Sequence, residues 1–232
     1  MRLDRYLCEL NIGTRSQVKE FIKKGLVSIN GRTIRLADYR IEEQTDQIAF
    51  QGKTLTYQKY VYYMLNKPQG VVSATQDNTA GTVTELLAAE GRKDLFPVGR
   101  LDKDTEGLLL LTNDGKLAHR LLSPKKHVDK TYLVTISHSL SEEDIRRLEQ
   151  GVDIGEDRMT LPAKVAVQSE RMIHLTIQEG KYHQVKRMLQ AVDNQVTALK
   201  RIRFGKIILD EELAPGAYRP LTTQEEKELH ES

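Results

Sequence analysis

The chain has almost no cysteine and no long apolar segment. Cys8 is the single cysteine in 232 residues, which excludes an internal disulfide framework and a cysteine-based metal site. We expect Cys8 to lie buried or half-buried in a helix. No apolar run approaches the roughly 20 residues that span a bilayer, and the opening Met1-Arg2-Leu3-Asp4 lacks a signal-peptide apolar region. We therefore expect a cytoplasmic protein with no membrane partner.

The remaining composition is that of a folded protein with an uneven charge. Hydrophobic residues make up 39% and charged residues 29% of the chain, with a net charge of +2. Residues 1–40 hold nine Lys and Arg against four acids, and residues 180–206 hold seven against Asp193 alone. Two concentrated basic segments indicate a polyanion bound along a defined track. For either segment alone, a solvated helix face would explain the charge equally well.

The first ~58 residues predict a small basic module. Residues 2–10 and 14–24 read as helices, and Thr14 with Gln17 forms a capping-box pattern. Alternating apolar residues on either side of Asn30-Gly31 predict a hairpin over 26–34, since that turn needs two positive φ angles. Helix, helix and hairpin resemble the RNA-binding domain named after small-subunit ribosomal protein four. The resemblance implies RNA contacts from four cations: Arg15, Lys19, Lys23 and Arg32.

The rest of the chain predicts a larger domain with more strands than helices. Residues 51–60 are polar and read as a linker, and a strand-like run begins at Val61. Further strands are expected at 107–112, 131–136, 172–177 and 199–209, and helices at 82–90, 115–122, 141–150, 181–192 and the last dozen residues. Because these strands and helices do not alternate regularly, we expect an α+β fold on a mainly antiparallel sheet with flanking helices. The predicted domains are residues 1–58 and 59–232.

One charged loop stands out as a place for chemistry. Gly99 and Gly107 flank Arg100, Asp102 and other charged residues, and the loop runs directly into an apolar strand. Loops held by a rigid strand commonly carry catalytic groups. On composition alone, a salt-bridged surface turn is the more ordinary interpretation.

Five motifs in order resemble the RsuA-type pseudouridine synthases. The charged loop and the strand after it match that family's catalytic motif, Gly-Arg-Leu-Asp followed by Thr, Gly and Leu-Leu-Leu-Leu-Thr-Asn-Asp-Gly. The other four matches span most of the larger domain: residues 65–70 (Leu-Asn-Lys-Pro-Gln-Gly), 130–132 (Lys-Thr-Tyr), 180–188 (Gly-Lys-Tyr-His-Gln-Val-Lys-Arg-Met) and 213–222. The resemblance implies an isomerase that acts on ribosomal RNA without a metal or organic cofactor. Within the family the chain is most similar to enzymes of small-subunit (16S) RNA, with large-subunit RNA as the alternative substrate.

The resemblance also implies roles for individual side chains. Asp102 is the family's nucleophile, which attacks the sugar or the base or removes a sugar proton. A carboxylate shielded from water by a bound nucleotide tends to protonate, and an adjacent cation opposes this. Lys186 aligns with that cation, which is an arginine in many relatives, and Arg187 is the alternative. Tyr132 corresponds to the tyrosine that stacks on the flipped uracil and assists proton transfer. RNA contacts are expected from Arg100, Lys181 and Arg187, whereas for His183 a structural hydrogen bond is the favoured interpretation.

Two other classes of function compete with this interpretation. A non-catalytic protein of ribosome assembly would use the same basic module, but it would not need the aspartate loop. A glycosidase would use Asp102 and Glu106 as a carboxylate pair, but the two basic segments argue against a neutral sugar substrate. We expect a monomer that binds ribosomal RNA or a partly assembled small ribosomal subunit.

Overall fold

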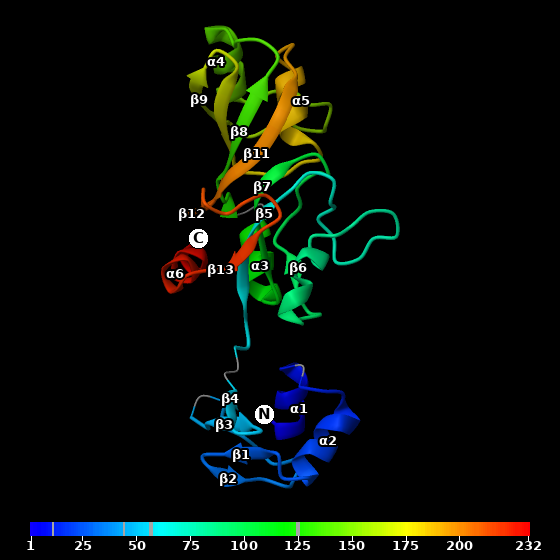
Figure 1. The fold of residues 1–232 in the computed structure, drawn as a ribbon. Coiled ribbons are helices and arrows are strands. Elements are labelled where there is room, and N and C mark those ends of the chain that lie inside the picture. The colour runs from blue at the N-terminus through cyan, green and yellow to red at the C-terminus, as the bar shows by residue number, and fades with distance from the viewer. Residues whose placement is uncertain (11, 44, 56–57, 124–125) are drawn as a thin grey trace. The chain divides into compact units, whose positions relative to one another are not determined.

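The computed structural model describes residues 1–10, 12–43, 45–55, 58–123 and 126–232. The chain divides into two compact units, Met1–Lys59 and Tyr60–Ser232. Figure 1 shows the helices and strands of each unit. Each unit closes its own apolar core: the first around Leu3, Ile22 and Ile48, and the second on both faces of a large sheet.

The first unit packs two helices against a four-stranded sheet of order β2-β1-β3-β4. Its elements are α1 (Leu3–Glu9), α2 (Arg15–Lys23), β1 (Val27–Ile29), β2 (Arg32–Thr33), β3 (Ile48–Phe50) and β4 (Lys53–Leu55). The predicted capping box is present, because the Thr14 hydroxyl accepts from the Gln17 amide and the Gln17 side chain accepts from the Thr14 amide. Asn30 and Gly31 have φ angles of 51° and 78°, as the predicted hairpin requires.

The prediction of a linker over 51–60 is wrong for residues 51–55. Gln51 and Gly52 have φ angles of 49° and 78°, so they form a second tight hairpin that joins β3 to β4. Glutamine gives little sequence signal for a left-handed turn, which is why the pattern reads as a linker. Residues 56 and 57 of the predicted linker lie outside the described residues.

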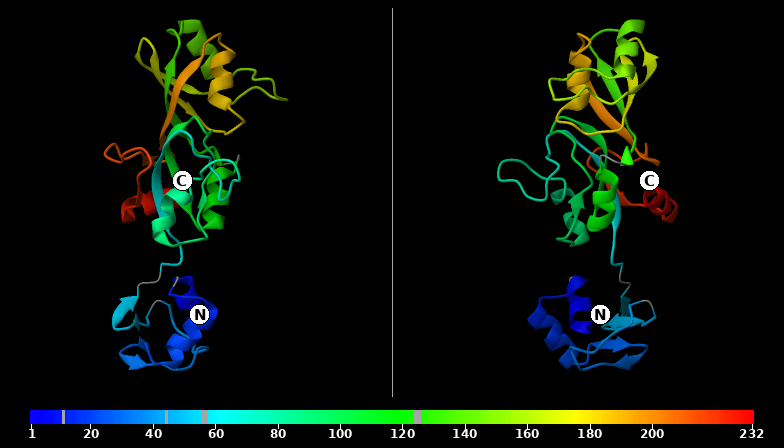
Figure 2. Two further views of the ribbon diagram at one scale, coloured as in Figure 1. Left: turned by 45° about the vertical axis from the view of Figure 1, so that its right-hand side comes forward. Right: turned by 180° about the vertical axis from the view of Figure 1, so that it is seen from behind.

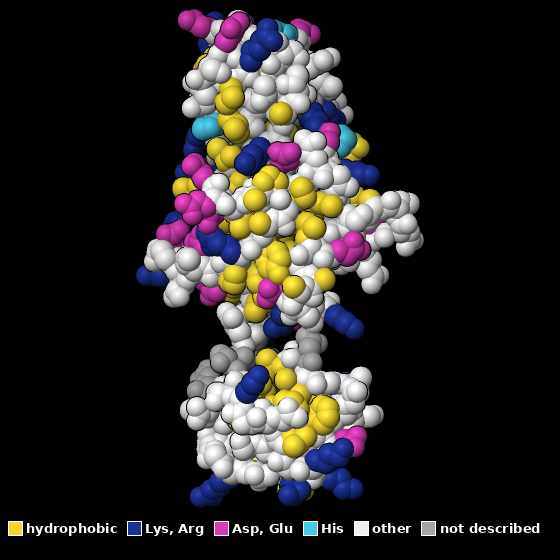
Figure 3. All heavy atoms as spheres, in the orientation of Figure 1, with side chains coloured by type: hydrophobic (Ala, Val, Ile, Leu, Met, Phe, Trp, Pro, Cys, Tyr) yellow, Lys and Arg dark blue, Asp and Glu magenta, His cyan; other side chains and the backbone are white. Residues whose placement is uncertain are grey.

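Cations cluster on the surface of the first unit. Arg15, Lys19, Lys23 and Arg32, on α2 and β2, are all exposed. None of the four forms an ion pair within 4 Å with a described residue. Lys and Arg side chains project from the end of this unit that holds α2 and the β1–β2 hairpin (Figures 1 and 3).

The second unit is built on one nine-stranded sheet whose main path runs β13-β5-β7-β11-β8-β10-β9, with β12 beside β11 and β6 beside β7. The strands are β5 (Tyr62–Lys67), β6 (Phe96–Pro97), β7 (Glu106–Thr112), β8 (Lys130–Ile136), β9 (Lys164–Ser169), β10 (Met172–Ile177), β11 (Val196–Phe204), β12 (Ile207–Ile208) and β13 (Tyr218–Pro220). All strand pairings described for this sheet are antiparallel except β7 with β11. The expected α+β fold on a mainly antiparallel sheet is confirmed.

Alternating side chains of the strands supply two separate cores. Tyr63 and Leu65 of β5 face one core, and Tyr62 and Met64 face the other. The helical elements are η1 (Glu85–Glu90, a 3₁₀ helix), α3 (Gly115–Leu122), α4 (Glu142–Gln150), α5 (Gln184–Gln190) and α6 (Thr223–Glu231). Residues of η1, α4 and α5 pack into the core that contains Tyr63 and Leu65. Residues of α3 and α6 pack into the core that contains Tyr62 and Met64. Figure 2 shows α5 and α6 on different parts of the sheet.

Several predicted elements differ from the structure in extent. The expected strand over 199–209 is two strands, β11 and β12, joined by a turn at Gly205. The expected helix over 181–192 begins only at Gln184, because His183 has a left-handed φ of 49°. Among the described residues, no helix combines the length and apolarity needed to cross a bilayer.

The two halves of the large sheet meet at one short parallel joint. Strands β7 and β11 pair through only two partners, Glu106 with Lys200 and Gly107 with Arg201. Gly107 has a φ of +100°, and a side chain there would place its Cβ 2.3 Å from the Arg201 carbonyl oxygen. Glycine is therefore required at Gly107 for the two strands to approach.

We expect Gly107→Ala to lower the free energy of unfolding of the larger unit by about 3 kcal/mol or more, because it combines a disfavoured φ with a backbone clash. Urea denaturation followed by circular dichroism measures this loss. The control is Gly180→Ala, where no atom lies within 4 Å of the added Cβ and the change should stay within about 0.5 kcal/mol. Equal midpoints for the two variants would contradict the steric role of Gly107.

Candidate functional site

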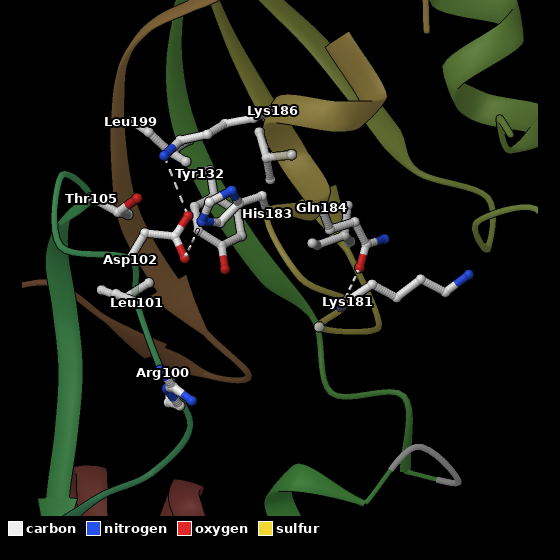
Figure 4. A pocket seen from close by; sticks show the side chains of 13 residues that line it. Arg100, Leu101, Asp102, Thr105, Tyr132, Lys181, His183, Gln184, Lys186 and Leu199 are labelled. Carbon is white, nitrogen blue, oxygen red and sulfur yellow. Dashed lines mark hydrogen bonds and ion pairs between the residues drawn. The ribbon is translucent and has the colours of Figure 1, made fainter. Parts of the chain in front are cut away.

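A polar pocket opens on the face of the sheet that α5 covers. Its walls come from the loop after β6, from strands β8, β10 and β11, and from the segment that leads into α5. The hollow holds about 440 Å³ of space, part of which is open to solvent. The lining residues are Arg100, Leu101, Asp102, Thr105, Tyr132, Ile177, Gly180, Lys181, His183, Gln184, Val185, Lys186 and Leu199. Figure 4 shows Asp102, Lys186, His183 and Tyr132 gathered together.

The backbone of the Asp102 loop is held by a buried lysine. Lys67, at the end of β5, is 0% exposed. Its Nζ donates to the carbonyl oxygens of Thr105 (2.8 Å), Asp102 (3.0 Å), Lys103 (3.4 Å) and Pro68 (3.0 Å). Burial lowers the pKa of Lys67 to about 8, and the nearby carboxylates of Asp104, Asp102 and Glu106 oppose that shift.

A second set of contacts holds the start of the same loop. The Ser73 hydroxyl donates to the Leu101 carbonyl (2.9 Å) and accepts from the Leu101 amide (3.0 Å). The Gly70 amide donates to the Lys103 carbonyl (2.8 Å). The segment around Lys67-Pro68-Gln69-Gly70 therefore shapes the loop that presents Asp102, which gives a physical reason for two distant motifs to occur together.

Lys186 is shared by two carboxylates. Its Nζ lies 3.4 Å from Asp102 Oδ2 and donates to Asp104 at 2.6 and 2.9 Å. Burial alone would lower the pKa of Lys186, but the hydrogen bond with Asp104 and the charge of Asp102 outweigh burial and raise it. The hydrogen bond from Lys186 also lowers the pKa of Asp104. The lysine is thus held as a cation beside the Asp102 carboxylate.

His183 lines the pocket, although the sequence interpretation favoured a structural hydrogen bond for it. Its Nε2 lies 3.6 Å from Asp102 Oδ1, so Asp102 stands between His183 and Lys186 (Figure 4). The left-handed backbone at His183 turns its ring out of the helical path and toward the pocket. The sequence interpretation placed His183 inside the helix expected over 181–192, and a single residue with a positive φ leaves no trace in the periodicity of the sequence.

Arg187 does not pair with Asp102, so the alternative to Lys186 does not fit the geometry. Its guanidinium binds the Glu156 carboxylate at 2.7 Å, the Tyr182 carbonyl at 3.0 Å and the Ile154 carbonyl. Lys181 is similarly engaged, because its Nζ donates to the carbonyl oxygens of Arg158 and Met159. Arg187 on α5 and Lys181 on the segment before it thus both bind the loop around 154–159. For Arg100, which is exposed at the pocket rim, no ion pair with a described residue is present.

Tyr132 forms the apolar wall of the pocket and has a buried cation behind it. Tyr132 is 7% exposed, and Arg201, its partner across β8 and β11, is 2% exposed. The Nε of Arg201 donates to the Leu108 carbonyl at 2.7 Å. Burial lowers the pKa of Arg201, and the neighbouring Tyr132 hydroxyl opposes this shift. Arg201 therefore cannot belong to a surface track, although the basic segment 180–206 included it.

No group of three or more His, Cys, Asp or Glu side chains suited to a metal ion occurs in the part of the chain that the structure describes. The Thr105 hydroxyl lines the pocket, is buried and has no hydrogen-bond partner among those residues.

Comparisons with known proteins give consistent similarities along the whole chain. The family model described as RNA pseudouridylate synthase matches residues 61–191, and the S4 domain model matches residues 1–48. A Bacillus subtilis (strain 168) protein named uncharacterized RNA pseudouridine synthase YtzG is 50% identical over 235 residues, covering 99% of this chain and 97% of that protein. The ribosomal small subunit pseudouridine synthase A of Haemophilus influenzae is 42% identical and covers 99% of both chains. A crystal structure of a pseudouridylate synthase is 41% identical, with a TM-score of 0.69 and 99% coverage of both chains.

We expect Lys67→Met to lower the free energy of unfolding by about 3 kcal/mol, because it leaves the four carbonyl oxygens without their shared donor. Urea denaturation of the full chain measures the change. Lys103→Met is the matched control: this lysine lies in the same loop but is exposed, so its effect should stay within about 0.5 kcal/mol. Similar losses in the two variants would show that the buried ammonium does not hold the loop.

Proposed function

This chain belongs to the RNA pseudouridylate synthase family, and we propose that it isomerises one uridine of small-subunit (16S) ribosomal RNA to pseudouridine. The observation that carries the proposal is the Asp102 carboxylate, paired with Lys186 in a pocket that also contains Tyr132. The relatives named ribosomal small subunit pseudouridine synthase A support the choice of subunit. Mapping pseudouridines in both ribosomal RNAs, with and without this gene, tests the substrate and the reaction together.

The reaction rearranges bonds within one nucleotide. The bond from ribose C1′ to uracil N1 breaks, the base turns, and C1′ bonds to C5. The proton on C5 leaves, and N1 gains a proton, so atoms and electrons balance without a redox partner, water or a group donor. The enzyme has to supply a nucleophile, a place for the turning base and a route for the proton.

Asp102 is the proposed nucleophile. Its side chain is 30% exposed and lines the pocket, so a nucleotide that enters can reach the carboxylate. The contacts of Lys67 and Ser73 fix the loop backbone, so the carboxylate needs little reorganisation before reaction. Lys186 supplies a positive charge that stabilises the ionised Asp102 carboxylate once the substrate excludes water from the pocket.

Tyr132 is the proposed platform for the flipped uracil. Extracting a base from its stack costs a few kcal/mol, and stacking on an aromatic ring recovers about 1–3 kcal/mol. The same side chain would assist removal of the C5 proton late in the reaction, by passing its own hydroxyl proton on as it receives the one from C5, and the Arg201 guanidinium lies beside that hydroxyl. Arg100, exposed at the rim, would occupy the space that the flipped base leaves or contact a phosphate.

We expect Asp102→Asn to reduce turnover by at least about a thousandfold while RNA affinity stays nearly unchanged, since the amide cannot act as a nucleophile. Release of tritium from ribosomal RNA labelled at uracil C5 measures turnover. Asp104→Asn, which alters the other carboxylate on Lys186, should retain easily measurable activity. Wild-type turnover in the Asp102 variant would rule out this mechanism.

The first unit should supply affinity and placement rather than chemistry. Replacing Arg15, Lys19, Lys23 and Arg32 together by Gln should weaken binding to long RNA and reduce the slope of log K against log salt by about 3. The same loss of slope is expected on deleting residues 1–58. The control replaces four exposed cations of the second unit, Arg146, Lys164, Lys206 and Lys227. An unchanged slope in the first variant would contradict this division of labour.

A further inference from the structure

The most exposed large hydrophobic side chain in the described part of the molecule lies next to the pocket. Tyr182 is 73% exposed, more than Leu36 at 66% or Ile208 at 61%. It precedes the pocket residue His183 but does not itself line the pocket. Its ring therefore extends from the rim, where an RNA strand entering the pocket would pass.

The ring is held in place rather than mobile on a flexible loop. Tyr182 stacks on His183 with ring centroids 3.8 Å apart and planes inclined by 19°. The Tyr182 carbonyl accepts a hydrogen bond from Arg187 at 3.0 Å. On its other side, Lys181 is tied to the carbonyl of Arg158 at 3.0 Å. A ring that is stacked on His183, with its backbone held through Arg187 and Lys181, loses little entropy when a ligand stacks on it.

The cations around this ring are already occupied within the protein. Lys181 binds backbone carbonyls, Lys186 binds Asp104, and Arg187 binds Glu156. Phosphate binding at this point would have to break those contacts. What this part of the rim offers to an RNA strand is therefore an aromatic face.

We propose that Tyr182 is a stacking platform for the base of an unpaired nucleotide beside the target uridine. Flipping the target leaves its neighbours without a stacking partner, and an aromatic ring accepts any base because every base has a π-face. The assignment differs from that of Tyr132, which stacks on the target itself. It rests on the proposed function, since it requires an extruded uridine in the pocket.

The test uses the full chain and a small-subunit ribosomal RNA fragment that carries the mapped uridine. The fragment has 2-aminopurine immediately 5′ or immediately 3′ of the target, so that stacking on the ring quenches its fluorescence. We expect quenching by the wild-type protein at one of the two positions. Tyr182→Ala should lose that quenching and raise the Kd by about fivefold to a hundredfold, with a larger effect on KM than on kcat. Tyr182→Trp should restore both.

Ile208→Ala is the control, because it removes a comparably exposed side chain of the same unit and should change neither quantity. The proposal is overturned if Tyr182→Ala binds and quenches like the wild type, if Tyr182→Trp fails as Ala does, or if Ile208→Ala has the same effect. Tritium release by the wild-type protein on the unmodified fragment distinguishes a failure of the proposed function from a failure of the stacking platform. No release there refutes the proposed function, whereas normal release with an unaffected Tyr182→Ala refutes only the stacking platform.

Discussion

The candidate site depends on a buried ammonium group that binds backbone rather than another side chain. Lys67 gathers the carbonyl oxygens of the loop that presents Asp102 and has no carboxylate in direct contact within 4 Å among the described residues. Burying such a charge is costly, and several hydrogen bonds to carbonyl dipoles are needed to offset it. The same arrangement leaves the Asp102 carboxylate unshared with Lys67, so that carboxylate is available to Lys186, His183 and a substrate.

Local sequence signals predicted most elements of the fold. The Asn30-Gly31 hairpin and the Thr14 cap follow from turn and capping chemistry, and both are present. The family resemblance is confirmed by the full-length similarity to known pseudouridine synthases. Strand β9 was not predicted, because its residues are mostly exposed and show no alternating burial. The second hairpin was missed because Gln51 is an unusual residue for a left-handed turn.

Side-chain contacts between distant elements were less predictable than the elements themselves. The motif resemblance selected Asp102, Tyr132 and Lys186, and all three line one pocket. The positions of His183 and Arg201 depend on a backbone turn and on the pairing of β8 with β11, neither of which periodicity reveals. Charge counting likewise could not separate an exposed cation from a buried one such as Arg201. Burial and partner choice are tertiary properties, so a count of basic residues overestimates the surface that binds RNA.

The short parallel joint between β7 and β11 has a mechanical consequence. The Asp102 loop leads into β7 and belongs to one half of the sheet, whereas Tyr132 and Lys186 belong to β8 and α5 on the other half. Within the sheet, two residue pairs and the bond from Arg201 to the Leu108 carbonyl connect those halves, and outside it Lys186 bridges them through Asp102 and Asp104. The stiffness of this seam therefore affects the spacing between the Asp102 carboxylate and Tyr132, and a slight twist of the sheet there would widen or narrow the pocket between them.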